Sequence, residues 1–353
     1  MTLNGQHKTG FYICSFKNEI MSLSLVTGGA GFIGAHVVNE LISRGHKVVV
    51  VDDLSGGFED NVNSKAIFIK GSVCNEAFIT KLFEEYKFDY VYHLAAYAAE
   101  GLSHFIRRFN YNNNLIGSIN LINESIKQKV KCFVFTSSIA VYGAGQLPMS
   151  EATTPLPEDP YGVSKYAVEL DLHSAHKMFG LNYVIFRPHN VYGEYQNIGD
   201  RYRNVIGIFM NQLMQGKPLT LFGDGNQTRA FSYISDVAPF IAKSVHIPEA
   251  HNQVFNIGAD REYTVNELAQ TIMKEMNIKG ELHYLPSRNE VVHAYSDHSK
   301  AKKIFEISEG SFTSLEAGIQ KMAAWARTVG ARASSKFDNI EITEKLPSVW
   351  KEI

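Results

Sequence analysis

The fold follows from Leu25-Val26-Thr27-Gly28-Gly29-Ala30-Gly31-Phe32-Ile33-Gly34, a short apolar run that ends in a glycine-rich turn and opens into the amphipathic residues 35–42. This pattern predicts a strand, a tight turn and a helix. Gly28, Gly31 and Gly34 suit a dinucleotide site, because they allow the turn, the approach of backbone to a pyrophosphate and close packing of helix on strand. The helix N-terminus would offer free N–H groups to the phosphates.

A second strand and an acid follow this unit. Residues 46–51 are mostly apolar and lead into Asp52, close to the ~20-residue spacing expected of a ribose-binding acid. Further apolar runs alternate with helical stretches, which predicts a parallel sheet with right-handed crossovers. The expected strands are residues 66–69, 90–96, 132–135 and 183–186, and the expected helices are residues 76–86 and 109–127. We therefore predict an α/β fold, a Rossmann-type doubly wound parallel sheet with a smaller C-terminal α/β substrate-binding lobe.

Composition excludes several classes of function. The chain has 353 residues, 45% of them hydrophobic, which is enough for a large buried core. A formal net charge of -2 gives no electrostatic basis for binding nucleic acid or an anionic membrane, and no apolar run approaches the ~20 residues that span a bilayer. Cys14, Cys74 and Cys132 lie far apart without metal-ligand spacing. We expect no metal, no nucleic-acid or membrane partner, and a cytoplasmic location.

A serine, a tyrosine and a lysine point to proton transfer. The fifth expected strand runs into Ser138, and Tyr161 and Lys165 stand four residues apart on a predicted helix, hence on one face of it. A nearby ammonium would lower the pKa of the tyrosine from its usual value of about 10, so that Tyr161 could exchange a proton with a sugar hydroxyl. Such a pair is common on ordinary solvated helices, but its position after a serine-terminated strand favours catalysis.

These motifs, with the Val141-Tyr142-Gly143 run, resemble the extended short-chain dehydrogenase/reductase superfamily. Within it the chain is similar to the NAD-dependent epimerase/dehydratase family, and there to UDP-glucose (UDP-hexose) 4-epimerases. The resemblance implies 4-epimerisation of a UDP-sugar through a transient 4-keto sugar, with hydride transfer to and from tightly bound NAD. It makes Tyr161 the proton acceptor of the 4-hydroxyl, Ser138 a hydrogen-bond partner of the 4-oxygen, and Lys165 a ligand of the nicotinamide ribose.

The resemblance also assigns binding residues. Besides Tyr161 and Lys165, it implies NAD contacts from Gly28, Gly31, Phe32, Ile33, Gly34, Asp52, Asp53, Leu54, Ser55, Ser72, Val73, Leu94, Ala95, Ala96 and Asn114. It implies UDP-sugar contacts from Ser138, Tyr161, Asn190, Arg229, Arg288 and Glu290.

The chain departs from the family pattern in three places. Ser72 stands where the family has an adenine-facing aspartate, and Glu290 follows Arg288 one residue earlier than the family's acid. Residues 97–102 are unusual and border the expected sugar pocket. Glu100 or His104 there would either tune specificity or lie on a loop surface.

Three alternatives stay open. The sugar-nucleotide dehydratases carry Asp-Glu immediately after the residue that matches Ser138, where this chain has Ile139 and Ala140, and the decarboxylases keep a glutamate where it has Ala140. A non-catalytic NAD-binding protein would not need all three of Ser138, Tyr161 and Lys165. The sugar is also open between glucose/galactose, an N-acetylhexosamine and glucuronate. Ala294 falls at the position that gates the C2 substituent, and its small size would leave room for an N-acetyl group.

The domain organisation is predicted as follows: residues 1–20 are a flexible extension, 21–190 an NAD-binding domain that recruits strands from about 229–258, 191–330 a nucleotide-sugar-binding lobe, and 331–353 a tail. By family resemblance, helices around Ile116 and Tyr161 would pair two subunits into a homodimer.

Overall fold

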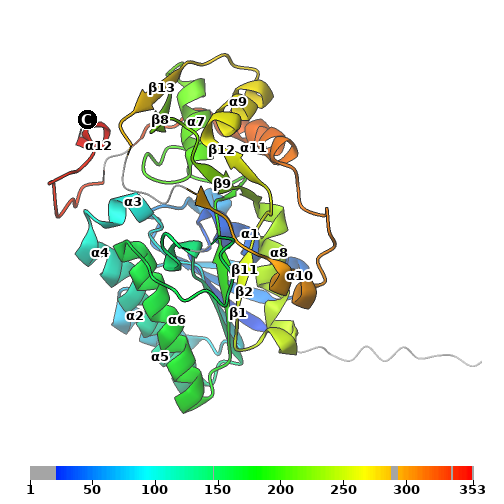
Figure 1. The fold of residues 1–353 in the computed structure, drawn as a ribbon. Coiled ribbons are helices and arrows are strands. Elements are labelled where there is room, and N and C mark those ends of the chain that lie inside the picture. Colours follow the sequence, from blue (N-terminus) through cyan, green and yellow to red (C-terminus); the bar gives the residue numbers. More distant parts are fainter. Residues whose placement is uncertain (1–20, 146, 288–292, 335–336, 352–353) are drawn as a thin grey trace, which may run out of the picture.

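The computed structural model describes residues 21–145, 147–287, 293–334 and 337–351. Seven parallel strands form the central sheet (Figure 1). In spatial order they are β11 (Gln253–Ile257), β6 (Tyr183–Pro188), β5 (Cys132–Thr136), β4 (Tyr90–His93), β1 (Leu23–Thr27), β2 (Lys47–Asp52) and β3 (Ile67–Lys70). The order reverses at β1, which lies between β4 and β2. The predicted Rossmann-type sheet is thus confirmed, and ligands of such sheets bind where the strand order reverses.

Helices cover both faces of the sheet, which explains why its central strands are apolar on both sides. One face carries α2 (Glu76–Glu85), α5 (Gly117–Gln128) and α6 (Pro160–Phe179), whereas the other carries α1 (Phe32–Ser43), α8 (Ala238–Lys243) and α10 (Ser299–Phe305) (Figure 1). The long helix expected over residues 109–127 is instead α4 (Arg107–Tyr111), a π-helical turn η2 (Asn112–Ile116) and α5.

A second lobe stands over the carboxyl ends of the strands (Figure 1). Its helices are α7 (Val205–Met214), α9 (Val265–Met276) and α11 (Leu315–Val329). Its strand pairs are β8 (Leu219–Phe222) with β13 (Leu282–Leu285), β7 (Val191–Tyr192) with β10 (Ser232–Tyr233), and β9 (Thr228–Ala230) with both β12 (Glu262–Thr264) and β14 (His293–Ala294).

The two lobes interleave in sequence, but not entirely as expected. Residues 253–257 join the central sheet as β11, as the sequence predicts. Residues 229–233 do not: β9 and β10 pair within the second lobe, because their partners β12, β14 and β7 lie there.

The chain finally returns to the first lobe. Residues 337–351, which end in α12 (Ser348–Lys351), run beside α3 (Glu100–Ser103) and α4 (Figure 1). Leu346 and Trp350 are buried there in an apolar cluster with Tyr97, Leu102 and Ile106. Among the described residues, no helix combines the length and apolar character that crossing a membrane requires.

Candidate active site

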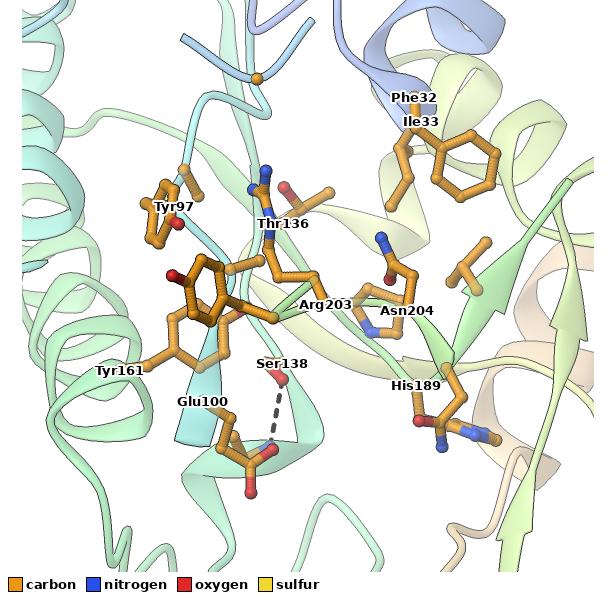
Figure 2. A pocket seen from close by; sticks show the side chains of 18 of the residues that line it. Phe32, Ile33, Tyr97, Glu100, Thr136, Ser138, Tyr161, His189, Arg203 and Asn204 are labelled. Atoms are coloured by element: carbon orange, nitrogen blue, oxygen red, sulfur yellow. Dashed lines mark hydrogen bonds between the residues drawn. The ribbon is translucent and has the colours of Figure 1, made fainter. Parts of the chain in front are cut away.

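A cavity of about 510 Å³ opens at the carboxyl ends of the strands, between the two lobes (Figure 2). Its lower wall is the glycine turn after β1 and the loops after β2, β4 and β5. Its upper wall comes from the segment between β6 and α7 and from β8, β9 and β14. The cavity therefore lies at the reversal point of the strand order, where this class of sheet binds its ligands.

The glycine turn is closed by backbone-to-backbone contact. Gly28 has φ +73°, and a Cβ there would stand 2.6 Å from the backbone nitrogen of Ala95. A Cβ on Gly34 would stand 2.1 Å from the carbonyl oxygen of Gly28, and one on Gly57 would stand 2.5 Å from that of Ala30. Side chains cannot enter at these positions, so the backbone itself forms the floor of the cavity.

Asp52 ends β2 at the edge of this turn. Its carboxylate accepts hydrogen bonds from the backbone N–H of Ala30, at 3.1 Å, and of Leu54, at 2.8 Å. Burial raises the pKa of Asp52, and these backbone donors oppose the rise. The acid thus lines the cavity beside the glycine turn, at the end of the second strand as its sequence spacing predicts.

Ser138, Tyr161 and Lys165 come together on the other side of the cavity, and Figure 2 shows Ser138 and Tyr161 near each other. The Lys165 ammonium donates to the carbonyl oxygen of Thr136 at 2.8 Å and lies 4.7 Å from the centre of the Phe135 ring. Burial lowers the pKa of Lys165 to about 7, with Glu169 opposing.

The protonation of Tyr161 differs from the sequence expectation. Burial raises the pKa of the Tyr161 hydroxyl, and a hydrogen bond from Ser138 opposes the rise. The lowering expected from Lys165 is not seen: burial is the largest cause of the rise, and Lys165 is not among the groups that shift the pKa of Tyr161.

A buried ion pair supports this wall from behind. Glu169, one turn beyond Lys165 on α6, accepts hydrogen bonds from the Ser137 hydroxyl and from the Arg187 guanidinium. Both charged side chains are only 5% exposed. The Arg187 guanidinium also lies 4.7 Å from the centre of the Tyr142 ring. This network joins β5, β6 and α6 directly behind the three predicted catalytic residues.

The opposite wall holds the predicted substrate residues. Asn190 has φ +39° and donates to the carbonyl oxygen of Ala230 at 3.2 Å. Arg229 lies next to Ala230 on β9, and Ala294 on β14 pairs with Arg229. All three line the cavity. Arg288 and Glu290 lie outside the described residues.

Comparison with known proteins identifies the family of this chain. Residues 24–258 match the NAD dependent epimerase/dehydratase family. The chain belongs to this family. It is 35% identical over 307 residues to a putative UDP-glucose 4-epimerase of Methanocaldococcus jannaschii, covering 86% of this chain and 98% of that one.

Two solved structures of epimerases have the same fold. The UDP-glucose 4-epimerase of Thermotoga maritima, with UDP-glucose, is 35% identical with a TM-score of 0.81, covering 87% of this chain and 99% of that one. The UDP-N-acetylglucosamine 4-epimerase of Methanobrevibacter ruminantium, in complex with UDP-N-acetylmuramic acid, is 30% identical with a TM-score of 0.80, covering 88% and 99%.

The geometry of this epimerase/dehydratase fits NAD, the family's cofactor. Among the described residues, no side chain caps the N-terminus of α1, and its first turn holds no acid. Its free N–H groups and positive dipole end therefore remain available to an anion. The bare glycine backbone allows a diphosphate to approach closely. Of the predicted NAD contacts, the cavity is lined by Gly28, Gly31, Phe32, Ile33, Gly34, Asp52, Asp53, Ser55, Val73, Leu94, Ala95, Ala96, Tyr161 and Lys165.

Three of the predicted NAD contacts stand outside this lining. Leu54 has φ +63° and donates its backbone N–H to Asp52, and Ser72 accepts a hydrogen bond from the backbone of Cys74. Asn114 is buried, and its amide bonds the backbone N–H and C=O of Tyr97. It thereby fixes the loop after β4.

Several cavity residues were not predicted from the sequence. Among them are Gly56 and Gly57 after β2, and Gln196, Arg203 and Asn204 before α7. The two glycines carry a recognisable signal, since they follow the acid of β2 in a polar loop. Gln196, Arg203 and Asn204 lie between β7 and α7, where the chain has no regular structure, and only the tertiary fold brings them to the site. No group of His, Cys, Asp and Glu among the described residues is arranged to hold a metal ion.

Proposed function

We propose that this protein is an NAD-dependent UDP-sugar 4-epimerase. The observation that carries the proposal is the convergence of Ser138, Tyr161 and Lys165 on one wall of a cavity whose floor is a bare glycine turn. The named relatives, which are UDP-sugar epimerases, support the same activity.

The residues divide the chemistry between them. NAD held by the glycine turn and Asp52 would supply the acceptor, and later the donor, for the hydride of sugar C4. Tyr161, as tyrosinate, takes the proton of the 4-hydroxyl, and Ser138 donates a hydrogen bond to the 4-oxygen of the resulting ketone. Lys165 has a pKa lowered to about 7, so it is partly protonated near neutral pH, and it would bind the nicotinamide ribose. After the keto sugar turns over, the hydride would return to the other face of C4, and Tyr161 gives the proton back to the 4-oxygen.

The dehydratase and decarboxylase alternatives need a further acid or base beside Ser138. Ile139 and Ala140 line the cavity at those positions, and neither side chain transfers protons. Epimerisation needs no group there, so it is the better match to this wall.

The test is NMR of UDP-glucose, UDP-N-acetylglucosamine and UDP-glucuronate, each incubated with the purified protein. We expect one of them to give its 4-epimer, with the same final ratio reached from either side. Tyr161→Phe should lower turnover by about 10²–10⁴-fold while NAD stays bound. A 4-keto-6-deoxy product would instead establish a dehydratase, and bound NAD with no turnover of any sugar would establish a binding protein.

Ala294 is the basis for a proposal on the sugar. It is 6% exposed, lines the cavity and packs against Val141, Tyr142 and Met149. We propose that its small side chain admits an N-acetyl group at C2. Ala294→Tyr should then reduce kcat/KM for UDP-N-acetylglucosamine and spare UDP-glucose. Equal losses for both sugars would contradict this assignment.

We also propose a homodimer in the cytoplasm. Ile116 on η2, with Val163 and Leu170 on α6, are large apolar side chains that are 38–55% exposed on adjacent helices, which suits a second subunit. Leu170→Asp should convert the dimer to a monomer in light scattering.

The thiols of Cys74 and Cys132 are free, in keeping with a reducing compartment.

The proposed roles follow the lobes. Residues 21–190 form the NAD-binding domain, with β11 recruited to its sheet, and residues 191–330 form the nucleotide-sugar lobe. The sequence of the tail from residue 331 onward assigns it neither to NAD binding nor to nucleotide-sugar binding.

A further inference from the structure

Arg203 belongs to the second lobe, but its side chain reaches across the cavity to the first. It lies in the segment between β7 and α7, and Figure 2 shows it extending into the cavity. Its guanidinium carbon is 4.6 Å from the centre of the Tyr97 ring. A Cβ placed on Gly56 would lie 3.1 Å from its Nη2 atom, so the guanidinium touches that glycine.

These two contacts locate the positive charge. Gly56 lies in the loop after β2, and Tyr97 lies in the loop after β4. Strands β2 and β4 are the two neighbours of β1 in the sheet. A group that touches both loops therefore stands over the end of β1, above the glycine turn and the N-terminus of α1. Anions bind there, and in a dinucleotide site the anion is the pyrophosphate.

We propose that Arg203 clamps the diphosphate of bound NAD from the nucleotide-sugar lobe. This inference rests on the NAD site of the proposed function. The planar guanidinium suits paired phosphate oxygens. The clamp would thereby link the two lobes across the cofactor.

The surroundings hold the guanidinium in this orientation. Asp200 accepts from Nε at 2.6 Å and also pairs with Nη2, and both side chains are largely buried. The backbone of Tyr97 is fixed by Asn114, which bonds both its N–H and its C=O. Arg203 is therefore set in place before any ligand arrives, which lowers the entropic cost of binding.

The C-terminal segment reinforces both sides of the clamp. The Phe337 ring lies 5.1 Å from that of Tyr97, and the Phe337 N–H donates to the Tyr202 hydroxyl at 3.1 Å. The Trp350 ring packs on Tyr202 at 5.3 Å. Residues 337–350 thus contact the ring beneath Arg203 and the residue preceding it in the chain.

The experiment measures cofactor retention in the protein as purified. NAD content is determined first, and bound NAD is then exchanged against excess isotopically labelled NAD. We expect Arg203→Met to speed exchange about ten- to hundredfold, because a hydrogen bond to a charged group is lost. Arg203→Lys should be intermediate, since it keeps the charge without the fork. Arg261→Met is the control: Arg261 also lies over a tyrosine ring, at 4.7 Å, but is exposed and away from the cavity lining.

Competing ligands localise the effect. ADP-ribose, which contains the diphosphate, should compete with NAD more weakly in Arg203→Met, whereas adenosine should compete as it does in the unmodified protein. The affinity for UDP, measured by calorimetry, should not change. Unchanged NAD exchange would overturn the proposal, as would a selective loss of UDP affinity or an equal loss for every ligand. Should Arg203→Met not fold, Gly56→Ala replaces it, since its methyl group displaces Nη2; unchanged exchange there would also overturn the clamp. None of these readouts requires epimerase activity.

Discussion

The two walls of the cavity are built in different ways. The cofactor wall is centred on the consecutive residues 28–34, which the loops after β2 and β4 flank, and its closest contacts join backbone to backbone, as between Gly28 and Ala95. The substrate wall brings together Asn190, Arg203, Arg229 and Ala294 from separate segments, and side chains hold it. A backbone wall tolerates no added atom, whereas a side-chain wall can be altered piece by piece. The two solved relatives are named for different sugars, UDP-glucose and UDP-N-acetylglucosamine, and a wall held by side chains is the part that can change to suit each.

The largest effect should come from adding one methyl group to the backbone wall. In Gly34→Ala, the Cβ would stand 2.1 Å from the Gly28 carbonyl oxygen, so the turn must move. We expect loss of bound NAD and a drop in the free energy of unfolding of about 3 kcal/mol or more. Denaturant titration and NAD content measure both. Gly145→Ala is the matched control, with its nearest atom at 3.9 Å. Normal NAD content in Gly34→Ala would show that the turn yields easily.

An effect of similar size on stability, without the loss of NAD, should come from the ion pair behind the catalytic wall. Arg187→Met leaves the Glu169 carboxylate buried without its cation, which costs about 3–5 kcal/mol. The double variant Arg187→Met/Glu169→Met should recover much of that loss, since it removes both charges. Thermal or chemical unfolding of the four proteins gives the coupling between the two side chains. If the stability losses of the two single variants add up to that of the double variant, the two side chains do not stabilise each other.

The two walls also differ in how far they can be predicted from the sequence. Gly28, Gly31, Gly34 and Asp52 are predictable, because their spacing along the chain is itself the geometry of the turn. Ser138, Tyr161 and Lys165 required a family resemblance. A tyrosine and a lysine four residues apart establish a shared helical face, but they do not say what that face meets.

Arg203 and the C-terminal segment could not have been predicted. Arg203 is separated from Gly56 and Tyr97 by more than a hundred residues, and only the sheet order brings the three together. Asn114 is a different case. The resemblance assigns it to NAD, whereas here its buried amide serves the backbone of Tyr97. The pKa expected for Tyr161 is wrong for a related reason. The spacing of Tyr161 and Lys165 along the helix indicates a nearby charge, but it does not show how deeply the Tyr161 hydroxyl is buried.

The C-terminal segment should show a local effect. Trp350 is 4% exposed in the cluster with Tyr97 and Leu102. In Trp350→Ala, amides that depend on this segment, such as those of Phe337 and Glu341, should exchange hydrogen about a hundredfold faster, corresponding to about 3 kcal/mol. Exchange in the central strands should stay slow. If β1 and β4 also exchange faster, the segment is part of the core and not a separate addition to the first lobe.

Buried histidines on both walls should give the smallest effect, a dependence of stability on pH. His93, behind the cofactor wall, accepts from Thr27 and donates to Ser118, an arrangement complete for a neutral ring. Burial lowers its pKa to about 3, and it likewise lowers the pKa of His189, on the substrate wall, to about 3.

The sign follows from where the protons bind. Below pH 6.5, the ordinary histidine pKa, the unfolded chain takes up protons that the folded protein refuses, so stability is complete above pH 6.5 and falls as the pH drops toward 3. Each such histidine can contribute up to about 1.4 kcal/mol per pH unit. Urea unfolding at pH 7.5 and 5.5 should therefore show a smaller difference for His93→Gln than for the unmodified protein, with the exposed His283→Gln as the control. The same experiment with His189→Gln compares the two walls. If His189→Gln changes the pH dependence of stability less than His93→Gln does, the side-chain wall relaxes around a charged imidazole ring more easily than the backbone wall. That outcome is expected of a wall whose side chains can move independently.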